Sequence, residues 1–279
     1  MASSKHDSAA APSKQCEQFS DTGDHIVVFR SSDNVLFNID RRQLQATTNG
    51  PLAVDLPAGV RDVTPLEEDA DTLETLFQFV YPRGYPSLEE AVFERLYKVA
   101  EAAEKYDVCP AVAITKIWMS ASQKEHLLEV MSYAYRHGYA ALLDKVAPRT
   151  VDVSVEKALD QFACLPLFIA WTRYKDAFHQ LFLRTTAFDY VDSHHTICYK
   201  FTVAKEMVHM KMHDHTPTSV SDGEALFDGK VLEEVVSECP SETLHYAPNC
   251  RKSTRRWKES LKQRIRDVPP LSRFEPRPI

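Results

Sequence analysis

The sequence contains little glycine and no long apolar run. Only 7 of its 279 residues are glycine. None of them lies in Gly-x-Gly-x-x-Gly, Gly-x-x-x-x-Gly-Lys-Ser/Thr or Gly-x-Ser-x-Gly, the patterns that cradle phosphates or present a nucleophilic serine. No stretch approaches the roughly twenty apolar residues that cross a bilayer, and the amino terminus lacks a secretory signal pattern. We therefore expect a non-enzymatic protein without a membrane segment, in the cytoplasm or the nucleus.

The six cysteines form no recognisable pattern. No Cys-x-x-Cys pair occurs among them, so we expect reduced thiols and no disulfide framework. Histidines concentrate between positions 194 and 215, and His209 and His213 would share one face of a helix, a spacing that zinc can use. A zinc site that supports a fold needs four ligands, and the nearest further candidates have irregular gaps: Cys198, Asp214, Cys239, His245 and Cys250. We favour solvated or singly paired histidines, with no metal and no cofactor.

Charge is distributed unevenly along the chain. The formal net charge is −7, but the tail from Arg251 to Ile279 has ten basic and three acidic residues, so it carries +7 and the remainder −14. Such a tail can bind nucleic acid or an acidic surface, or it can dock on the acidic body of the same chain. Trp257, Leu261 and Ile265 repeat at helical spacing and give this basic helix an apolar stripe. We therefore expect these three residues to anchor a docked tail, and we do not expect nucleic acid as a partner.

The stretch from Asp69 to Met119 predicts three helices. Apolar residues of the first helix recur at three- and four-residue spacing: Leu73, Leu76, Phe77 and Val80. Proline ends that helix at Tyr81-Pro82, and the second helix runs from Phe93 through an alanine-rich side. The third begins at Pro110 and is expected to turn these side chains toward the same core: Val112, Ile117 and Trp118 or Met119.

Upstream of these helices the pattern favours strands. Two β-rich runs, Ile26 to Arg30 and Val35 to Ile39, flank the turn-forming residues 31–34 and predict a hairpin. A short helix through Leu44 follows, and Asn49-Gly50-Pro51, Pro57 and Gly59 interrupt regular structure before a strand near residues 63–66. Residues 1–20 are rich in alanine, serine and lysine and predict a disordered tail.

Beyond Met119 every periodic segment is helical. Ser154 is expected to cap one helix, His137-Gly138 to end another, and the segment 221–224 to start a further one as a capping box. The longest helix places a stripe of mainly aromatic side chains in a core: Phe168, Trp171, Tyr174, Phe178, Leu181 and Phe182. We divide the chain into a tail (1–20), an α+β domain (21–122), a helical extension (123–192) and a carboxy-terminal helical region with the basic tail (193–279).

The order of these elements resembles a known interaction domain. A helix ending in Val80-Tyr81-Pro82, a turn, and a long helix ending in Ala103-Glu104-Lys105-Tyr106 before a short helix look like the carboxy-terminal half of a fungal BTB/POZ domain. The hairpin at residues 24–39 is similar to the opening of that family, and the resemblance covers roughly residues 21–120. The segment Asp40-Arg41-Arg42-Gln43-Leu44 sits where the family usually has His-Lys-x-x-Leu, so the chain departs from it at Asp40.

The resemblance implies a small β-sheet flanked by a helical cluster, followed by an all-helical extension. It also implies a protein-interaction module that forms a homodimer, with hairpin and first-helix residues at the interface: Ile26, Val28, Asp40, Arg41 and Leu44. Alternatives are a substrate adaptor of a cullin-based ubiquitin ligase and a recruitment factor in transcription or chromatin. The hydrophobic-x-Glu feature by which the family contacts a cullin is missing between Pro51 and Leu56, and Leu66-Glu67-Glu68 follows the strand instead of preceding it.

Overall fold

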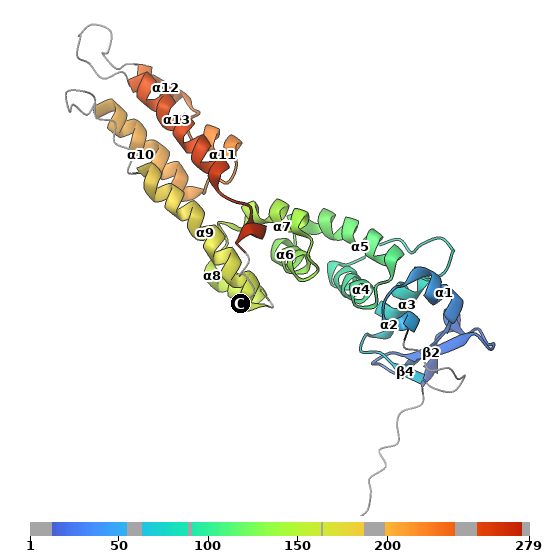
Figure 1. Ribbon diagram of the computed structural model, residues 1–279. Helices are drawn as coiled ribbons and strands as arrows, with labels where there is room; N and C mark the ends of the chain where they lie inside the picture. Colours follow the sequence, from blue (N-terminus) through green and yellow to red (C-terminus); the bar gives the residue numbers. More distant parts are fainter. Residues whose placement is uncertain are drawn as a thin grey trace, which may run out of the picture. The chain divides into compact units, whose positions relative to one another are not determined.

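The protein divides into two compact units, and each is described by itself. The structure is a computed structural model that describes residues 13–54, 63–88, 91–162, 164–186, 199–237 and 250–274 (Figure 1). The first unit is Met1–His126 and the second is Leu127–Ile279. The first contains a small sheet with helices and the second, where described, is helical. The chain is therefore a mixed α/β protein, as expected at that level. No described helix combines the length and apolar character of a membrane span.

The sheet of the first unit has four strands in the order β1-β3-β2-β4. Strands β2 (Ile26–Arg30) and β3 (Val35–Asp40) form the predicted antiparallel hairpin, and Asn34 in its turn has a left-handed φ of 68°. Two edge strands, β1 (Lys14–Gln15) and β4 (Val63–Pro65), pair in parallel with β3 and β2. Because side chains alternate along a strand, the inner face of the hairpin carries Phe29, Phe37 and Ile39, all fully buried.

The expectation of disorder through residue 20 is wrong for the last part of that segment. A 3₁₀ helix, η1 (Glu17–Phe19), follows β1, and Phe19 is buried. The Phe19 ring lies 6.0 Å from the ring of Phe37 and 6.0 Å from that of Phe77. One large aromatic side chain thus gives the segment enough buried apolar surface to order it. Residues 1–12 lie outside the described part of the chain.

Helix α3 (Ala70–Gln78) packs on the inner face of the sheet. The Asp69 side chain caps the helix by accepting a hydrogen bond from the Thr72 amide at 2.9 Å. The predicted stripe is confirmed, because all four of its side chains are fully buried: Leu73, Leu76, Phe77 and Val80. The Phe77 ring stacks 5.4 Å from Phe29, so α3 and the hairpin share one core.

Helices α4 (Phe93–Tyr106) and α5 (Cys109–Ala121) complete this core, and one sequence prediction for α5 is wrong. Asp107 ends α4 in the left-handed conformation, and Pro110 lies in the first turn of α5. Met119 is buried as expected, but Ile117 is 65% exposed. The buried face of α5 follows Ala111, Thr115 and Met119 at four-residue spacing, and at about 100° per residue Ile117 lies some 200° from Thr115.

The first helices are tied to the turn between α4 and α5. Helix α1 (Arg41–Thr47) is followed by α2 (Pro51–Val54), a short helix where interrupted structure was expected; Pro57 and Gly59 lie outside the described residues. Thr48 forms an isolated bridge with Val108, and its hydroxyl donates to the Tyr106 carbonyl. A Cβ atom on Gly50 would lie 2.2 Å from the Tyr106 carbonyl oxygen, so only glycine fits there.

The second unit begins with four α-helices and a 3₁₀ helix. These are α6 (Leu127–Arg136), α7 (Ala140–Val146), η3 (Ala147–Thr150), α8 (Val155–Gln161) and α9 (Leu165–Thr186). Gly138 has the predicted left-handed φ of +70°, and Ser154 caps α8. Trp171, Tyr174, Phe178 and Leu181 of α9 are buried, whereas the Phe182 side chain lies outside the described residues. The Trp171 indole donates to the Thr150 hydroxyl at 2.9 Å.

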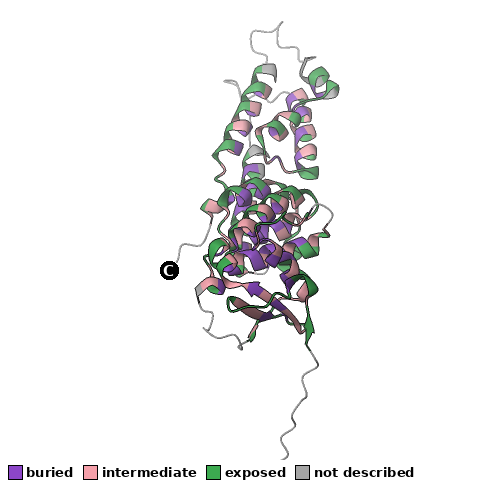
Figure 2. Cartoon of the chain, turned by 90° about the vertical axis from the view of Figure 1, so that its right-hand side faces the viewer, coloured by how far each residue is buried: buried purple, intermediate pink, exposed green. Residues whose placement is uncertain are grey.

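The remaining helices of this unit are α10 (Tyr199–Asp214), α11 (Val220–Ala225), α12 (Lys230–Ser237), α13 (Cys250–Asp267) and η4 (Leu271–Arg273). The capping box was predicted two residues too late, because Ser219 and Asp222 form it. Gly229, with a φ of +138°, separates α11 from α12. Figure 2 shows the buried positions along one side of the helices and exposed positions along the other.

Candidate interaction surfaces

Asp40 has a local structural role at the start of α1. Its carboxylate caps α1 by accepting from the Arg42 amide at 2.8 Å, and it forms an ion pair with the Arg42 guanidinium at 2.8 Å. These hydrogen bonds from Arg42 lower the pKa of Asp40. The Asp40 amide donates to the Tyr81 hydroxyl at 3.0 Å. Asp40 therefore fixes the start of α1 and keeps Arg41 at the surface, half-buried.

The face of the sheet opposite α3 carries apolar side chains. In the register of the strands, Val28 pairs with Asn38 and with Val63, and Ile26 pairs with Asp40. Paired residues point to the same side, so four apolar residues share this face, which we call the outer sheet face: Ile26, Val28, Leu36 and Val63. Ile26, Val28 and Leu36 are half-buried, and Val63 is 40% exposed. The outer sheet face thus has four partly exposed apolar side chains, interleaved with Arg30, Asn38 and Asp40.

Two residues of the outer sheet face, Leu36 and Val63, were not identified from the sequence. Leu36 alternates with the buried Phe37, so the two-residue period of the strand was the signal that could have placed it outside. Val63 joins the surface only through the parallel pairing of β4 with β2, which no local pattern predicts. Leu44, in contrast, is the fully buried residue of α1 and offers no surface to a partner.

The acidic pair after β4 is already engaged within the first unit. Lys105 lies 2.8 Å from a carboxylate oxygen of Glu67 and 2.8 Å from one of Glu68, and the Tyr106 hydroxyl donates to Glu68. Burial alone would lower the pKa of Lys105, but the hydrogen bonds to the two carboxylates outweigh it and raise that pKa. The carboxylate of Glu68 is 14% exposed. It therefore fixes α4 to the sheet and does not extend toward a partner.

A hollow of about 430 Å³ lies between α4 and the end of α5. Its lining includes Leu88, Val92, Phe93 and Trp118, and the Phe93 ring stacks on the His126 ring with centroids 3.7 Å apart. Val92 is 71% exposed at its rim. The sequence offered Trp118 as an alternative to Met119 for the core and did not predict this open apolar surface.

The histidines of the second unit are spread over different environments. His209 lies edge-on to Trp257 with ring centroids 5.9 Å apart, and burial lowers its pKa. His213 is exposed, and His215 pairs with Asp152 at 2.8 Å. Among the described residues no three His, Cys, Asp or Glu side chains converge to hold a metal ion. His194, His195, Cys198, Cys239 and His245 lie outside those residues, as does the Cys250 side chain.

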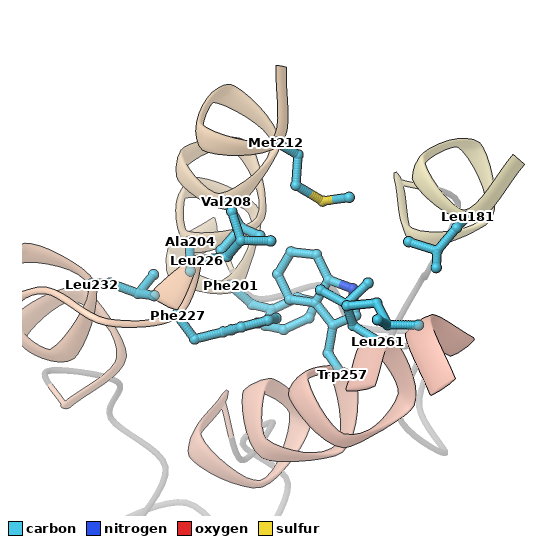
Figure 3. Close-up of a cluster of buried hydrophobic side chains, with 11 residues drawn as sticks. Leu181, Phe201, Ala204, Val208, Met212, Leu226, Phe227, Leu232, Trp257 and Leu261 are labelled. Carbon is cyan, nitrogen blue, oxygen red and sulfur yellow. The ribbon is translucent and has the colours of Figure 1, made fainter. Parts of the chain in front are cut away.

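The three residues predicted to anchor the tail lie in a cluster of buried hydrophobic side chains of the second unit. Figure 3 shows the Trp257 indole among side chains of α10 and the segment after α11, and Trp257 is 1% exposed. Its ring lies edge-on to Phe227 at 5.0 Å and to Phe201 at 6.1 Å. Leu261 is fully buried and Ile265 is 6% exposed. The apolar stripe of α13 is therefore docked on the helices of its own unit.

The close approach of α11 to α13 depends on a glycine. A Cβ atom on Gly223 would lie 2.6 Å from the Ile265 Cδ1 atom, so the two helices meet with no room for a larger residue unless Ile265 moves.

A comparison of the sequence with known protein-family models and with curated proteins finds no match.

Proposed function

We propose that the chain is a non-enzymatic, BTB-type protein-interaction module that forms a homodimer through its first unit. The observation that carries the proposal is the outer sheet face, where four apolar side chains from three strands remain partly exposed, whereas Phe29, Phe37 and Ile39 on the opposite face are fully buried. The order of hairpin, capped first helix and α3–α5 cluster fits the same family. An incompletely covered apolar surface on an otherwise packed domain is typical of a protein-interaction site.

A two-fold dimer gives this surface a self-complementary partner. In such an interface the same patch of each protomer faces its copy, so apolar residues meet apolar residues and Arg41 lies near the rim. Stable homodimers bury upwards of about 2,000 Å² in total, more than four side chains supply. The first helix, beginning at Arg41 beside the hairpin, therefore belongs to the proposed interface with the outer sheet face.

The test is the oligomeric state of the full chain. We expect sedimentation velocity to show a dimer across about 1 to 50 µM, and Val28→Asp to produce a monomer because it places a charge in an apolar interface. Arg41→Glu is a second variant that leaves the sheet unchanged and should weaken the dimer by altering rim charge. Val92→Asp, at an exposed position in the same unit, is the matched control and should remain a dimer.

A monomeric wild-type chain at the highest concentration would overturn the proposal. So would a dimer that Val28→Asp and Arg41→Glu leave intact while Val92→Asp dissociates it, because the interface would then lie at the hollow between α4 and α5. Circular dichroism of each variant establishes that the fold is retained before its mass is interpreted.

A further inference from the structure

Helix α13 separates its apolar and basic residues onto opposite faces. Trp257, Leu261 and Ile265 point into the core, and the positions on the far side carry cations. At about 100° per residue, Arg255 and Arg266 lie within some 20° of each other, with Lys252 and Arg256 on the same exposed half. All four are exposed. We call these four residues the basic face of α13.

The arginines of this face are not needed to hold the helix in place. Lys262 lies 2.8 Å from Glu224 of α11, and Lys258 lies 3.6 Å from Asp228 just after it. These lysines therefore match the nearby acids. Arg255, Arg256 and Arg266 form no ion pair in the parts of the chain that the structure describes, and all three side chains are exposed. Arg266 lies close enough to Glu224 for its charge to help lower the pKa of that carboxyl.

Docking of the tail and binding of a polyanion are consequently compatible. From the sequence, docking of the tail and binding of nucleic acid are alternatives. The structure shows that docking uses the apolar stripe and leaves the basic face open. An arginine is charged at every physiological pH, so the face stays positive although the whole chain carries −7.

We propose that the basic face of α13 binds duplex nucleic acid through its phosphates. Arg256 and Arg266 are ten residues apart, which is about 15 Å along a helix, and a major groove about 12 Å wide admits a helix between its two phosphate backbones. Gln263 lies between the arginines and brings an amide to the face, while the carboxylate of Glu259 at its centre pairs with Lys262 at 3.1 Å.

Other polyanions fit this face less well. It has no aromatic residue on which the bases of a single strand would stack. The apolar stripe that an amphipathic helix would insert into a membrane is already buried. An acidic protein segment would also neutralise the arginines, and the experiment distinguishes it from a duplex.

The test measures the salt dependence of duplex binding by the full chain. Fluorescence anisotropy with a labelled DNA duplex of about 24 base pairs is expected to give log Kd rising with log salt at a slope of about 3.6, for four phosphate contacts at 0.9 each. Affinity then falls about 150-fold between 50 and 200 mM salt. In the triple variant Arg255→Gln, Arg256→Gln, Arg266→Gln the slope should fall to about 0.9, a loss of about 3.5-fold over the same range.

Two matched triple variants control for net charge and for the fold. Arginine-to-lysine changes at the same three positions should keep the steep slope, because counterion release depends on charge. Glutamine at Lys145, Lys157 and Arg173, which are exposed cations elsewhere in the second unit, should also keep it. These readouts do not involve the oligomeric state, so this inference and the proposed dimer can fail separately.

Three results would overturn the inference. The first is the absence of saturable duplex binding at 50 mM salt. The second is a slope that the glutamine variant at Arg255, Arg256 and Arg266 leaves unchanged. The third is displacement of the labelled duplex by polyglutamate as effectively as by unlabelled duplex of equal charge, which would assign the face to an acidic protein partner.

Discussion

Replacing Trp257 by alanine tests whether the basic helix stabilises the second unit. The side chain is 1% exposed, so its truncation removes nearly all of its buried area and leaves a cavity, a change that costs about 3 to 5 kcal/mol for a large aromatic residue. Two edge-to-face contacts, with Phe227 at 5.0 Å and Phe201 at 6.1 Å, are lost as well. We expect a loss of about 4 kcal/mol in the free energy of unfolding of this unit.

Urea denaturation followed by tryptophan fluorescence measures this loss. In a Trp118→Phe background the remaining tryptophans, Trp171 and Trp257, both belong to the second unit, and Trp171 alone reports on the variant. With a slope of about 2 kcal/mol per molar urea, a loss of about 4 kcal/mol lowers the midpoint by about 2 M. Arg255→Ala, on the exposed face of the same helix, should change stability by less than about 0.5 kcal/mol. An unchanged midpoint for Trp257→Ala would refute the docked helix.

Three further predictions concern single contacts. Gly50→Ala should destabilise the first unit by at least about 1 to 3 kcal/mol in thermal unfolding, because the new Cβ meets the Tyr106 carbonyl oxygen at 2.2 Å. Thr150→Val should cost about 1 to 3 kcal/mol in urea, because it leaves the buried Trp171 indole without its acceptor. The hydrogen bond from Thr72 lowers the pKa of Asp69, so the charged carboxylate stabilises the fold above its unfolded pKa of about 3.9 and this contribution is lost as pH falls through the lowered value. The stability difference between wild type and Asp69→Asn should therefore shrink below about pH 4.

Each of these changes has a matched control. Gly84→Ala adds a Cβ with nothing within 4 Å and should be nearly neutral. Thr150→Ser keeps the hydroxyl that accepts from Trp171 and should recover most of the lost stability. Asp71→Asn removes an exposed carboxylate from the same helix without removing a cap, so it should cost less stability at pH 7 than Asp69→Asn. A Gly50→Ala variant as stable as wild type, a neutral Thr150→Val, or an unchanged pH profile for Asp69→Asn would contradict the corresponding contact.

Local periodicity was sufficient for much of the secondary structure. The hairpin, the buried stripe of α3 and the aromatic side of α9 could all be predicted, because each rests on residues close in sequence whose spacing matches one regular element. The error at Ile117 arose where α5 is apolar on nearly every side, so that spacing alone did not identify the buried face. The order of segment 17–19 depended on Phe19 reaching Phe77, a contact with no local signal.

The candidate surfaces were harder to predict than the elements that carry them. Ile26 and Val28 were named from a resemblance, but their neighbours on the outer sheet face follow from strand order, which brings Val63 beside Val28. Glu68 reads as a free acid in the sequence, and only the fold brings Lys105 to it. The free arginines of α13 could not be recognised as such until the ion pairs of Lys258 and Lys262 were known.

The attachment of α1 to the turn after α4 affects how the protein is made. The Thr48 hydroxyl finds its acceptor 58 residues later, at Tyr106. At a synthesis rate of about 5 to 20 residues per second, roughly 3 to 12 seconds pass between translation of the two residues. During that time α1 lacks this contact at its end, although Asp40 can cap its start, and the side chain of Leu44 has an incomplete core to enter. Messages truncated before the Tyr106 codon would therefore yield chains in which Leu44, the buried residue of this otherwise polar helix, is exposed, and such chains are expected substrates for chaperones and proteases.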